Sequence, residues 1–160
     1  PALFRRNDTA VGHWFDGDGL VRAFRLQGGE ATVTARFVDT AKRRTETGVG
    51  RIVQPGFNTP TRDGAVLGSA DDTNPANTHV IPTGNRLLAL WEAGSAHALD
   101  PATLETQGPV TFRPELKGMP FLAHPRIEPD GRIWNLGMGG KRAFVWRLSA
   151  DGRFQAGQAI

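Results

Sequence analysis

The sequence of 160 residues contains no cysteine. This absence excludes disulfide bonds, thiolate metal ligands and a cysteine nucleophile from the segment. It is compatible with a reducing compartment, and we expect the protein in the cytoplasm. The chain begins at Pro1 rather than at an initiator methionine. We therefore expect further residues upstream, and a targeting signal there stays open.

The sequence also lacks long apolar runs and a sustained helical period. No apolar stretch reaches the length needed to cross a bilayer, and no secretory signal precedes the first strand-like segment. A content of 39% hydrophobic and 22% charged residues is that of a globular protein. Because 20 glycines and 11 prolines punctuate the chain and leave little room for long helices, we predict an all-β fold.

A strong charge of one sign is missing as well. The formal net charge is +3, from 19 basic and 16 acidic residues. The two kinds are interspersed, and no dense run of Lys and Arg is interleaved with aromatic residues as in a nucleic-acid-binding face. We interpret the charge as a solvated surface and expect no nucleic acid among the partners.

Strand-like segments dominate what is present. Residues 20–26 alternate apolar and basic side chains, and the β-branched residues of 31–38 return after a glycine turn, which predicts an antiparallel hairpin. Residues 42–76 are polar and rich in Gly, Pro and Thr, which predicts a long loop-rich insertion with at most one short element. Further pairs are predicted for residues 77–81 with 86–92, 97–99 with 103–105, 125–127 with 132–136, and 144–148 with 153–154.

Three of the predicted turns resemble one another, at residues 99–104, 127–132 and 148–153. Each follows an apolar strand end with a short polar residue, then Pro or Ala, a turn and a fresh strand. Short antiparallel hairpins repeated in this way are more typical of β-propeller blades than of a sandwich. A run of unrelated hairpins is the alternative. In either case residues 1–160 form a single segment.

His124 is the strongest candidate for a metal ligand. It lies between Ala123 and Pro125 in a segment that continues to a Pro-Asp-Gly turn. A residue before proline is pushed into the extended region, so the direction of this imidazole is largely fixed before anything binds. One histidine cannot make a metal site, and the rest of the chain supplies no obvious second ligand.

The other histidines and turn motifs favour structural roles. His13 opens a His-Trp-Phe-Asp-Gly-Asp-Gly motif whose spacing suggests a calcium loop, but Gln27 stands where an EF-hand requires glutamate and no helices are predicted beside it. We therefore predict a turn whose aspartates bond nearby amides, with His13 packed in the core. His79 and His97 lie in predicted strands, where each is expected to cap the strand or to pack against its neighbours. Residues 137–142 lack the phosphate-loop spacing and predict a β-turn.

Glu92 follows Trp91 at the end of an apolar strand. A carboxylate there needs a partner or solvent. It is either an exposed strand-end charge or the acceptor for the ring N–H of a metal-bound histidine, whose orientation it would fix. The residues alone favour neither interpretation.

An ordered series of segments resembles the carotenoid cleavage oxygenase family. This family of non-haem iron dioxygenases also includes stilbene-cleaving enzymes and the retinal-pigment-epithelium isomerase. The resemblance runs from about residue 13 to residue 148. It implies a seven-bladed β-propeller with Fe(II) on its axis, held by four histidines, three of them steadied by glutamates. The segments that carry it are 13–24, 77–80, 86–92, 99–106 and 121–137.

The resemblance also implies roles for individual residues. The Ala-His-Pro segment matches the one that carries the family's first iron histidine, which maps to His124. The Leu-Trp-Glu segment matches the one that carries an orienting glutamate, which maps to Glu92, and the adjacent Trp91 is a candidate for lining the substrate tunnel. The histidines outside this segment match no ligand position. The other three iron ligands lie downstream in the family, so we expect Glu92 to lack its histidine partner here.

The chain is therefore interpreted as an N-terminal fragment, about two blades of a propeller and roughly the first third of an enzyme. We expect the full-length parent to be an Fe(II)-dependent dioxygenase that cleaves a carbon–carbon double bond of a carotenoid, apocarotenoid or stilbene-like substrate with O₂. The fragment alone is expected to be inactive. Peripheral contact of the full-length parent with a membrane stays open. The alternative is a non-catalytic β-propeller module that binds partners through its loops.

Overall fold

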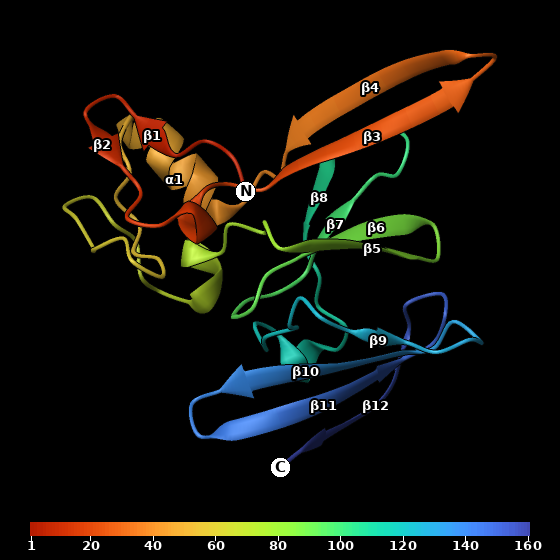
Figure 1. Cartoon of the computed structure of the whole chain (residues 1–160). Helices are drawn as coiled ribbons and strands as arrows, with labels where there is room; N and C mark the ends of the chain where they lie inside the picture. Colours follow the sequence, from red (N-terminus) through yellow and green to blue (C-terminus); the bar gives the residue numbers. More distant parts are fainter.

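Two four-stranded antiparallel sheets dominate the computed structural model, which describes residues 1–160 (Figure 1). In each sheet the strands are neighbours in chain order, so that each is a simple meander. This is the architecture of a propeller blade, and the predicted all-β fold with about two blades is confirmed. The first blade holds β5 (His79–Thr83), β6 (Arg86–Leu90), β7 (His97–Leu99) and β8 (Thr106–Pro109), and the second holds β9 (Arg126–Ile127), β10 (Ile133–Gly139), β11 (Arg142–Leu148) and β12 (Phe154–Ala159).

Two-residue turns connect the central strands of both blades. Gly84 follows β5 with φ 57°, and Gly140 follows β10 with φ 60°. A positive φ at the first turn position is what a type II′ hairpin requires, and glycine adopts it without steric cost. The turn residues thus fix the strand pairing that alternating apolar residues predict.

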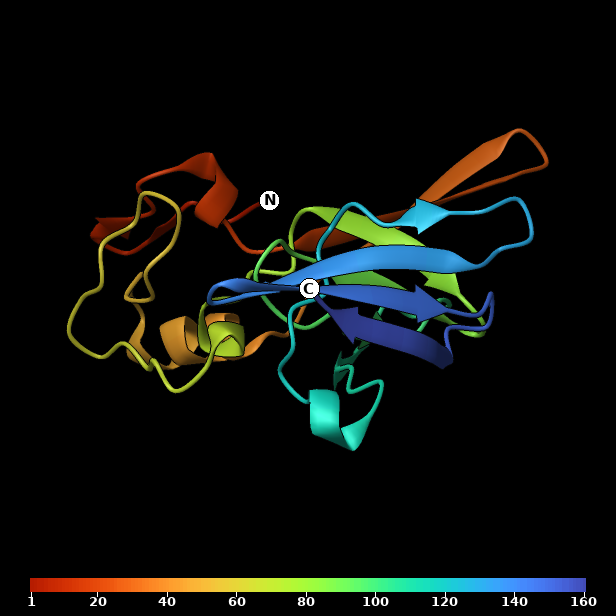
Figure 2. The ribbon, with the colours of Figure 1, turned by 90° about the horizontal axis from the view of Figure 1, so that it is seen from below.

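A long hairpin precedes the first blade. It consists of β3 (Leu20–Gln27) and β4 (Glu30–Phe37), which pair along their whole length as predicted. Both views show it extending away from the blades, while the N-terminal segment lies at the other end of the molecule (Figure 2). Its side chains include the exposed Phe24, Leu26 and Val33.

One predicted pairing is wrong. The partner of β7 is β8 at Thr106–Pro109 rather than residues 103–105. The carboxylate of Asp100 accepts the backbone N–H groups of Ala102 and Thr103 at 2.9 and 2.8 Å, which closes a turn there. Leu104 then has φ 60°, a left-handed conformation that does not occur within a strand. The strand resumes only beyond it.

The segment predicted as loop-rich contains a helix, α1 (Ala41–Val49), which corrects the expectation for its first part. The Thr40 hydroxyl accepts the N–H of Arg43 at 3.2 Å and caps the helix, and Gly50 ends it with φ 70°. The buried face of α1 consists of Lys42 and Glu46 rather than apolar residues. The remainder is loop apart from a 3-10 turn, η2 (Ala70–Thr73). No helix is long and apolar enough to span a bilayer.

Short elements complete the chain. Lys42 Nζ lies 3.0 Å from Asp18 Oδ1, which ties α1 to the N-terminal segment, and 2.9 Å from Glu46 Oε2 within the helix. Charges as buried as these persist only when they are paired. The short elements are β1 (Arg5–Arg6), β2 (Thr9–Ala10), η1 (Trp14–Asp16) and η3 (Pro114–Leu116).

The main hydrophobic core joins the two blades. Leu88 and Leu90 from β6 pack in one buried cluster with Trp146 and Leu148 from β11. Trp146 donates its indole N–H to the carbonyl of Pro120 at 3.0 Å. The one polar group of this buried aromatic side chain is thereby hydrogen-bonded. The connection between the blades is thereby anchored just before the segment that carries His124.

Candidate metal-binding site

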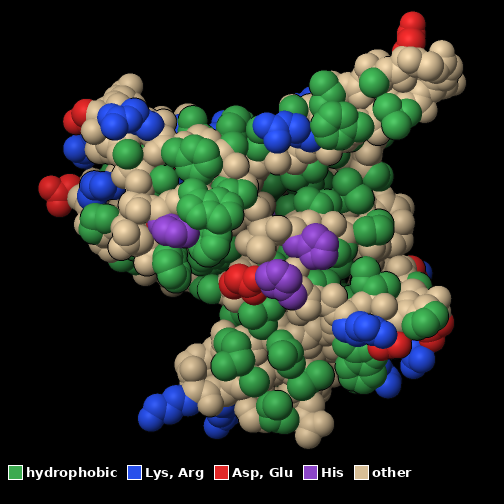
Figure 3. All heavy atoms as spheres, in the orientation of Figure 1, with side chains coloured by type: hydrophobic (Ala, Val, Ile, Leu, Met, Phe, Trp, Pro, Cys, Tyr) green, Lys and Arg blue, Asp and Glu red, His purple; other side chains and the backbone are tan.

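His124 and Glu92 meet between the two blades. Glu92 follows β6 and His124 precedes β9, and the distance from His124 Nδ1 to Glu92 Oε1 is 2.7 Å. Figure 3 shows histidine and acidic side chains gathered on one face of the molecule, where the sheets adjoin. Glu92 thus contacts His124 within the chain. That its intended partner is one of the downstream histidines stays a prediction.

The hydrogen bond settles which ring nitrogen of His124 carries the proton. A carboxylate only accepts, so Nδ1 is the donor. In the neutral ring the lone pair then lies on Nε2, which makes no hydrogen bond within the chain. The side chain of His124 is 75% exposed, whereas that of Glu92 is 42% exposed. This is the arrangement in which a carboxylate orients a metal-binding imidazole.

Several main-chain contacts hold the segment before His124. Phe121 donates its N–H to the carbonyl of Gly94 at 3.0 Å, and the Leu122 N–H donates to the Leu136 carbonyl at 3.0 Å. The amide of Asn135 donates to the carbonyl of Leu122 at 2.7 Å. Phe121 is thus tied to the first blade and Leu122 to the second before the chain reaches Pro125.

The chain by itself does not complete a metal site. It contains no group of three or more His, Cys, Asp or Glu side chains placed to hold one ion. The ring centroids of His79 and His124 lie 6.5 Å apart, and His79 Nδ1 is engaged with the carbonyl of Ala123 at 2.8 Å. One neutral imidazole with a free Nε2 fits a transition metal ion as a single ligand. A metal ion bound there would need further ligands besides these residues.

An aromatic cleft of about 770 Å³ opens beside His124. Trp91 and Glu92 contribute to its wall from the first blade, and Trp14, Phe15 and Phe57 contribute from the N-terminal half. Trp14, Phe15 and Phe57 are largely exposed, so their rings are available for contact with a ligand. Sequence reasoning found Trp91 but missed these three. The aromatic pair beside a glycine-rich turn was the signal that could have found two of them.

Asp16 builds the aromatic wall. Its carboxylate accepts the backbone N–H groups of Phe57 and Asn58 at 2.6 and 3.1 Å and the Thr59 hydroxyl at 2.7 Å. As a result the rings of Phe15 and Phe57 lie 5.9 Å apart although they are distant in sequence. The prediction that this aspartate bonds nearby amides is wrong, since its partners lie some forty residues away.

His13 packs against the rings of this wall rather than in the core. It is half-buried, and its Nδ1 accepts the N–H of Phe15 at 3.1 Å, which caps η1. Its ring centroid lies 5.0 Å from that of Phe57. The expectation of a packed core histidine is therefore wrong, although a structural role is retained.

His97 is the buried histidine of the chain. It lies in β7 with 2% of its surface exposed, and its Nδ1 has no hydrogen-bond partner. Burial lowers the pKa of His97 below its ordinary value, because the charged ring is poorly solvated there, and Asp71 opposes this effect only in part. His97 therefore packs, as predicted, and is held neutral.

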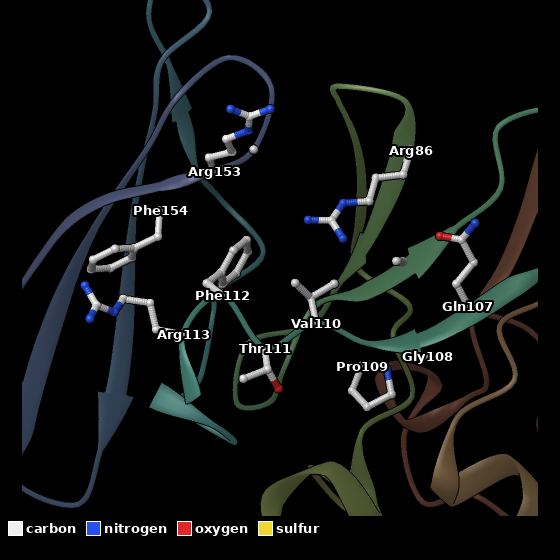
Figure 4. Close-up of a pocket in the computed structure, with 12 residues that line it drawn as sticks. Arg86, Gln107, Gly108, Pro109, Val110, Thr111, Phe112, Arg113, Arg153 and Phe154 are labelled. Carbon is white, nitrogen blue, oxygen red and sulfur yellow. The ribbon is translucent and has the colours of Figure 1, made fainter. Parts of the chain in front are cut away.

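A second hollow, of about 610 Å³, lies between the blades (Figure 4). Its charged lining residues are Arg86, Arg113 and Arg153, which Figure 4 shows around Phe112 and Phe154. Arg113 pairs with Glu115 at 2.5 Å and Arg153 with Asp151 at 3.0 Å. The hollow contains no metal-ligating side chain and shares no lining residue with the cleft beside His124. The cleft is therefore the candidate site.

Comparison with known proteins places the chain in a family. Residues 1–159 match the family described as retinal pigment epithelial membrane protein. The chain is 38% identical over 134 residues to the apocarotenoid-15,15'-oxygenase of Synechocystis, a match that covers 81% of the chain and 27% of that enzyme. It is 40% identical over 116 residues to resveratrol cleavage oxygenase 1 of Aspergillus fumigatus, covering 72% and 23%.

A third relative and two solved structures support the same family assignment. Lignostilbene-alpha,beta-dioxygenase isozyme III of Sphingomonas paucimobilis is 35% identical over 126 residues, covering 78% of the chain and 25% of that enzyme. Crystal structures of cobalt-substituted Synechocystis apocarotenoid oxygenase and of a glutamate-to-aspartate variant superpose with a TM-score of 0.84, at 30% and 29% identity. Both cover 100% of this chain and 36% of the solved chain.

The chain thus spans about a quarter of the length of the curated relatives it matches. The family match extends over nearly every residue, and the blades superpose on those of the solved oxygenases. The chain therefore belongs to the retinal pigment epithelial membrane protein family, the family of the carotenoid cleavage oxygenases.

Proposed function

We propose that the full-length protein is an iron-dependent oxygenase that cleaves a carbon–carbon double bond of a conjugated, largely apolar substrate with O₂. The observation that carries this proposal is the pair of His124 and Glu92 on the wall of an aromatic cleft. Relatives named for cleaving apocarotenoid, resveratrol and lignostilbene support the substrate class. We place the activity in the parent, because the chain supplies one ligand.

The residues fit the proposed iron. Imidazole nitrogen is a common ligand of iron in proteins, and His124, with its exposed side chain, lines the cleft. The cobalt-substituted relative supports a metal centre that accepts divalent ions. Iron would supply the binding and activation of O₂, while Glu92 would keep the His124 ring in the orientation and tautomer that present Nε2.

The spacing of three residues supports a functional cleft. Solved variants of the Synechocystis apocarotenoid oxygenase replace a threonine, a tryptophan and a glutamate; the last two are consecutive, and the threonine precedes the tryptophan by thirteen residues. This chain has the same residue types at the same spacing, namely Thr78, Trp91 and Glu92. All three line the cleft beside His124.

The cleft suits an extended conjugated molecule. Trp14, Phe15, Phe57 and Trp91 present aromatic surface, which binds a planar apolar chain through burial and stacking. Asp16 fixes the loop that carries Phe57, so the wall is formed before a ligand enters. Preformed walls reduce the entropy lost on binding. The role of this chain would be to orient the substrate and one metal ligand.

The test uses the full-length protein reconstituted with Fe(II). Iron content and the loss of substrate absorbance are measured for the natural protein, for His124→Ala, and for His13→Ala as a control that removes a histidine without a carboxylate partner. We expect His124→Ala to lose iron and activity, and His13→Ala to keep its iron. Stoichiometric iron and full activity in His124→Ala would refute the role of His124 as a ligand. A natural full-length protein that binds no iron and cleaves no polyene would refute the proposal and favour a non-catalytic propeller module.

A further inference from the structure

We propose that His79 is a positioning residue that fixes the direction of His124 by holding the peptide carbonyl in front of it. This inference rests on the proposed function, since the direction of His124 matters only if its ring binds a metal. His79 opens β5 in the first blade, whereas His124 precedes β9 in the second. Its Nδ1 lies 2.8 Å from the carbonyl oxygen of Ala123.

Three hydrogen bonds converge on the dipeptide Ala123–His124. Glu92 Oε1 accepts from the His124 ring at 2.7 Å, and Glu92 Oε2 accepts the N–H of Ala123 at 3.3 Å. His79 takes the remaining backbone polar group of Ala123, its carbonyl. Because a carbonyl only accepts, Nδ1 of His79 must be the donor. The backbone in front of the proposed ligand is therefore held at both its N–H and its C=O.

A single rigid unit supplies both holding groups. His79 pairs with Leu90 in the register of β5 and β6, and Glu92 follows two residues beyond Leu90. Both side chains therefore move with one hairpin. Ala123 is fully buried, but its methyl group makes few packing contacts that could fix the orientation of its backbone. Its orientation depends on the polar groups at its two ends, of which His79 provides one.

The carbonyl of Ala123 controls where the imidazole points. Rotation of the peptide plane between Ala123 and His124 swings the Cα–Cβ bond of His124 with it. Pro125 already restricts His124 on its other side, so the plane held by His79 is the main backbone freedom left. Metal sites tolerate displacements of only about 0.5 Å. Loss of the His79 contact should therefore weaken metal binding although His79 is not a ligand.

The matched variants are His79→Asn, His79→Gln and His79→Leu in the full-length protein. The Nδ2 of asparagine stands at the same bond from the backbone as Nδ1 of histidine, and can donate to the Ala123 carbonyl. The amide of glutamine lies one bond further out, near the position of Nε2, and leucine has no donor. If His79 acts through its Nδ1 contact, asparagine alone restores that contact. If His79 only fills space, leucine replaces it equally well.

The first measurement is a titration of the metal-free protein with Co(II), followed by visible absorption. We expect His79→Leu and His79→Gln to bind about 10-fold more weakly, the lower end of the effect of an orienting partner, with an altered spectrum. His79→Asn should keep the natural affinity and spectrum. Natural cobalt binding in His79→Leu would overturn the inference, and so would an equal loss in His79→Asn and His79→Leu.

A second measurement needs no metal. In the metal-free protein labelled with ¹⁵N-histidine, the ring N–H of His124 should be protected from exchange by Glu92. His79→Leu should speed this exchange, and His79→Asn should restore protection; unchanged protection in His79→Leu would refute the positioning role. Failure of the proposed function shows separately, as unchanged cobalt binding in His124→Ala.

Discussion

Replacing Glu92 with glutamine tests the contact on which the site depends. The two carboxylate oxygens accept from the His124 ring at 2.7 Å and from the Ala123 N–H at 3.3 Å. Glutamine has nearly the same shape but presents one oxygen and one NH₂ group. With its oxygen toward His124, its NH₂ group faces another donor at Ala123. With its NH₂ group toward His124, the ring must accept at Nδ1, which moves the proton to Nε2 and removes the lone pair that a metal needs.

The size of the effect follows from the strength of the contact. A hydrogen bond to a charged group contributes about 1.5–3 kcal/mol. Because both side chains are partly exposed, solvent competes and the lower figure applies. Since about 1.4 kcal/mol corresponds to a factor of ten in binding, Glu92→Gln should weaken metal affinity by roughly 10-fold. Losses of roughly 10–100-fold are usual for such partners.

The assay compares metal affinity and turnover of full-length variants. Glu128→Gln is the matched control, because it removes a carboxylate that lies 3.6 Å from Arg126 at the start of the second blade. We expect the control to behave as the natural protein. Glu92→Asp keeps the charge but shortens the reach by one methylene, and should fall between the two. Unchanged affinity and turnover in Glu92→Gln would refute this reasoning and leave Glu92 as a strand-end charge.

Two further predictions concern pH and completeness. Burial holds the pKa of His97 below its ordinary value of 6.5, so that, as the pH falls, the unfolded chain binds a proton at His97 before the folded protein does. The contribution of His97 to stability is therefore present above pH 6.5 and is lost as the pH falls through its folded pKa. Unfolding midpoints between about pH 5 and 8 should show this loss, and His97→Leu should flatten it; an equal slope in both proteins would contradict it. The 160-residue chain alone should bind iron no better than one exposed histidine and cleave no polyene, as iron analysis and substrate absorbance can check. Stoichiometric iron in that chain would be the contrary result.

The blades could be predicted because local signals agree there. In β5 and β6 the apolar residues flank a glycine that the turn requires, and β10 and β11 repeat the pattern around Gly140. The partner of β7 was misplaced by the Asp100 turn, whose hydrogen bonds delay the strand by a few residues. Side-chain capping of this kind competes with strand pairing and leaves little trace in apolar periodicity.

The helix and the aromatic wall escaped prediction for a different reason. The buried face of α1 is made of Lys42 and Glu46, so a search for apolar residues at helical spacing finds no buried stripe. Phe57 reaches Phe15 only through the hydrogen bonds of Asp16. Such contacts join residues that are distant in sequence, and no local pattern encodes them. The resemblance to a family identified His124 and Glu92, but not their contact with each other.

The candidate site is a product of two blades rather than of either one. Glu92 and His79 stand on the hairpin of the first blade, whereas Ala123 and His124 lead into the second. The buried cluster around Trp146 contains residues of both sheets and fixes their relative position. A shift of one blade against the other would break all three hydrogen bonds at once, because their partners move with one hairpin. Packing between blades is therefore what gives a largely exposed imidazole a fixed direction.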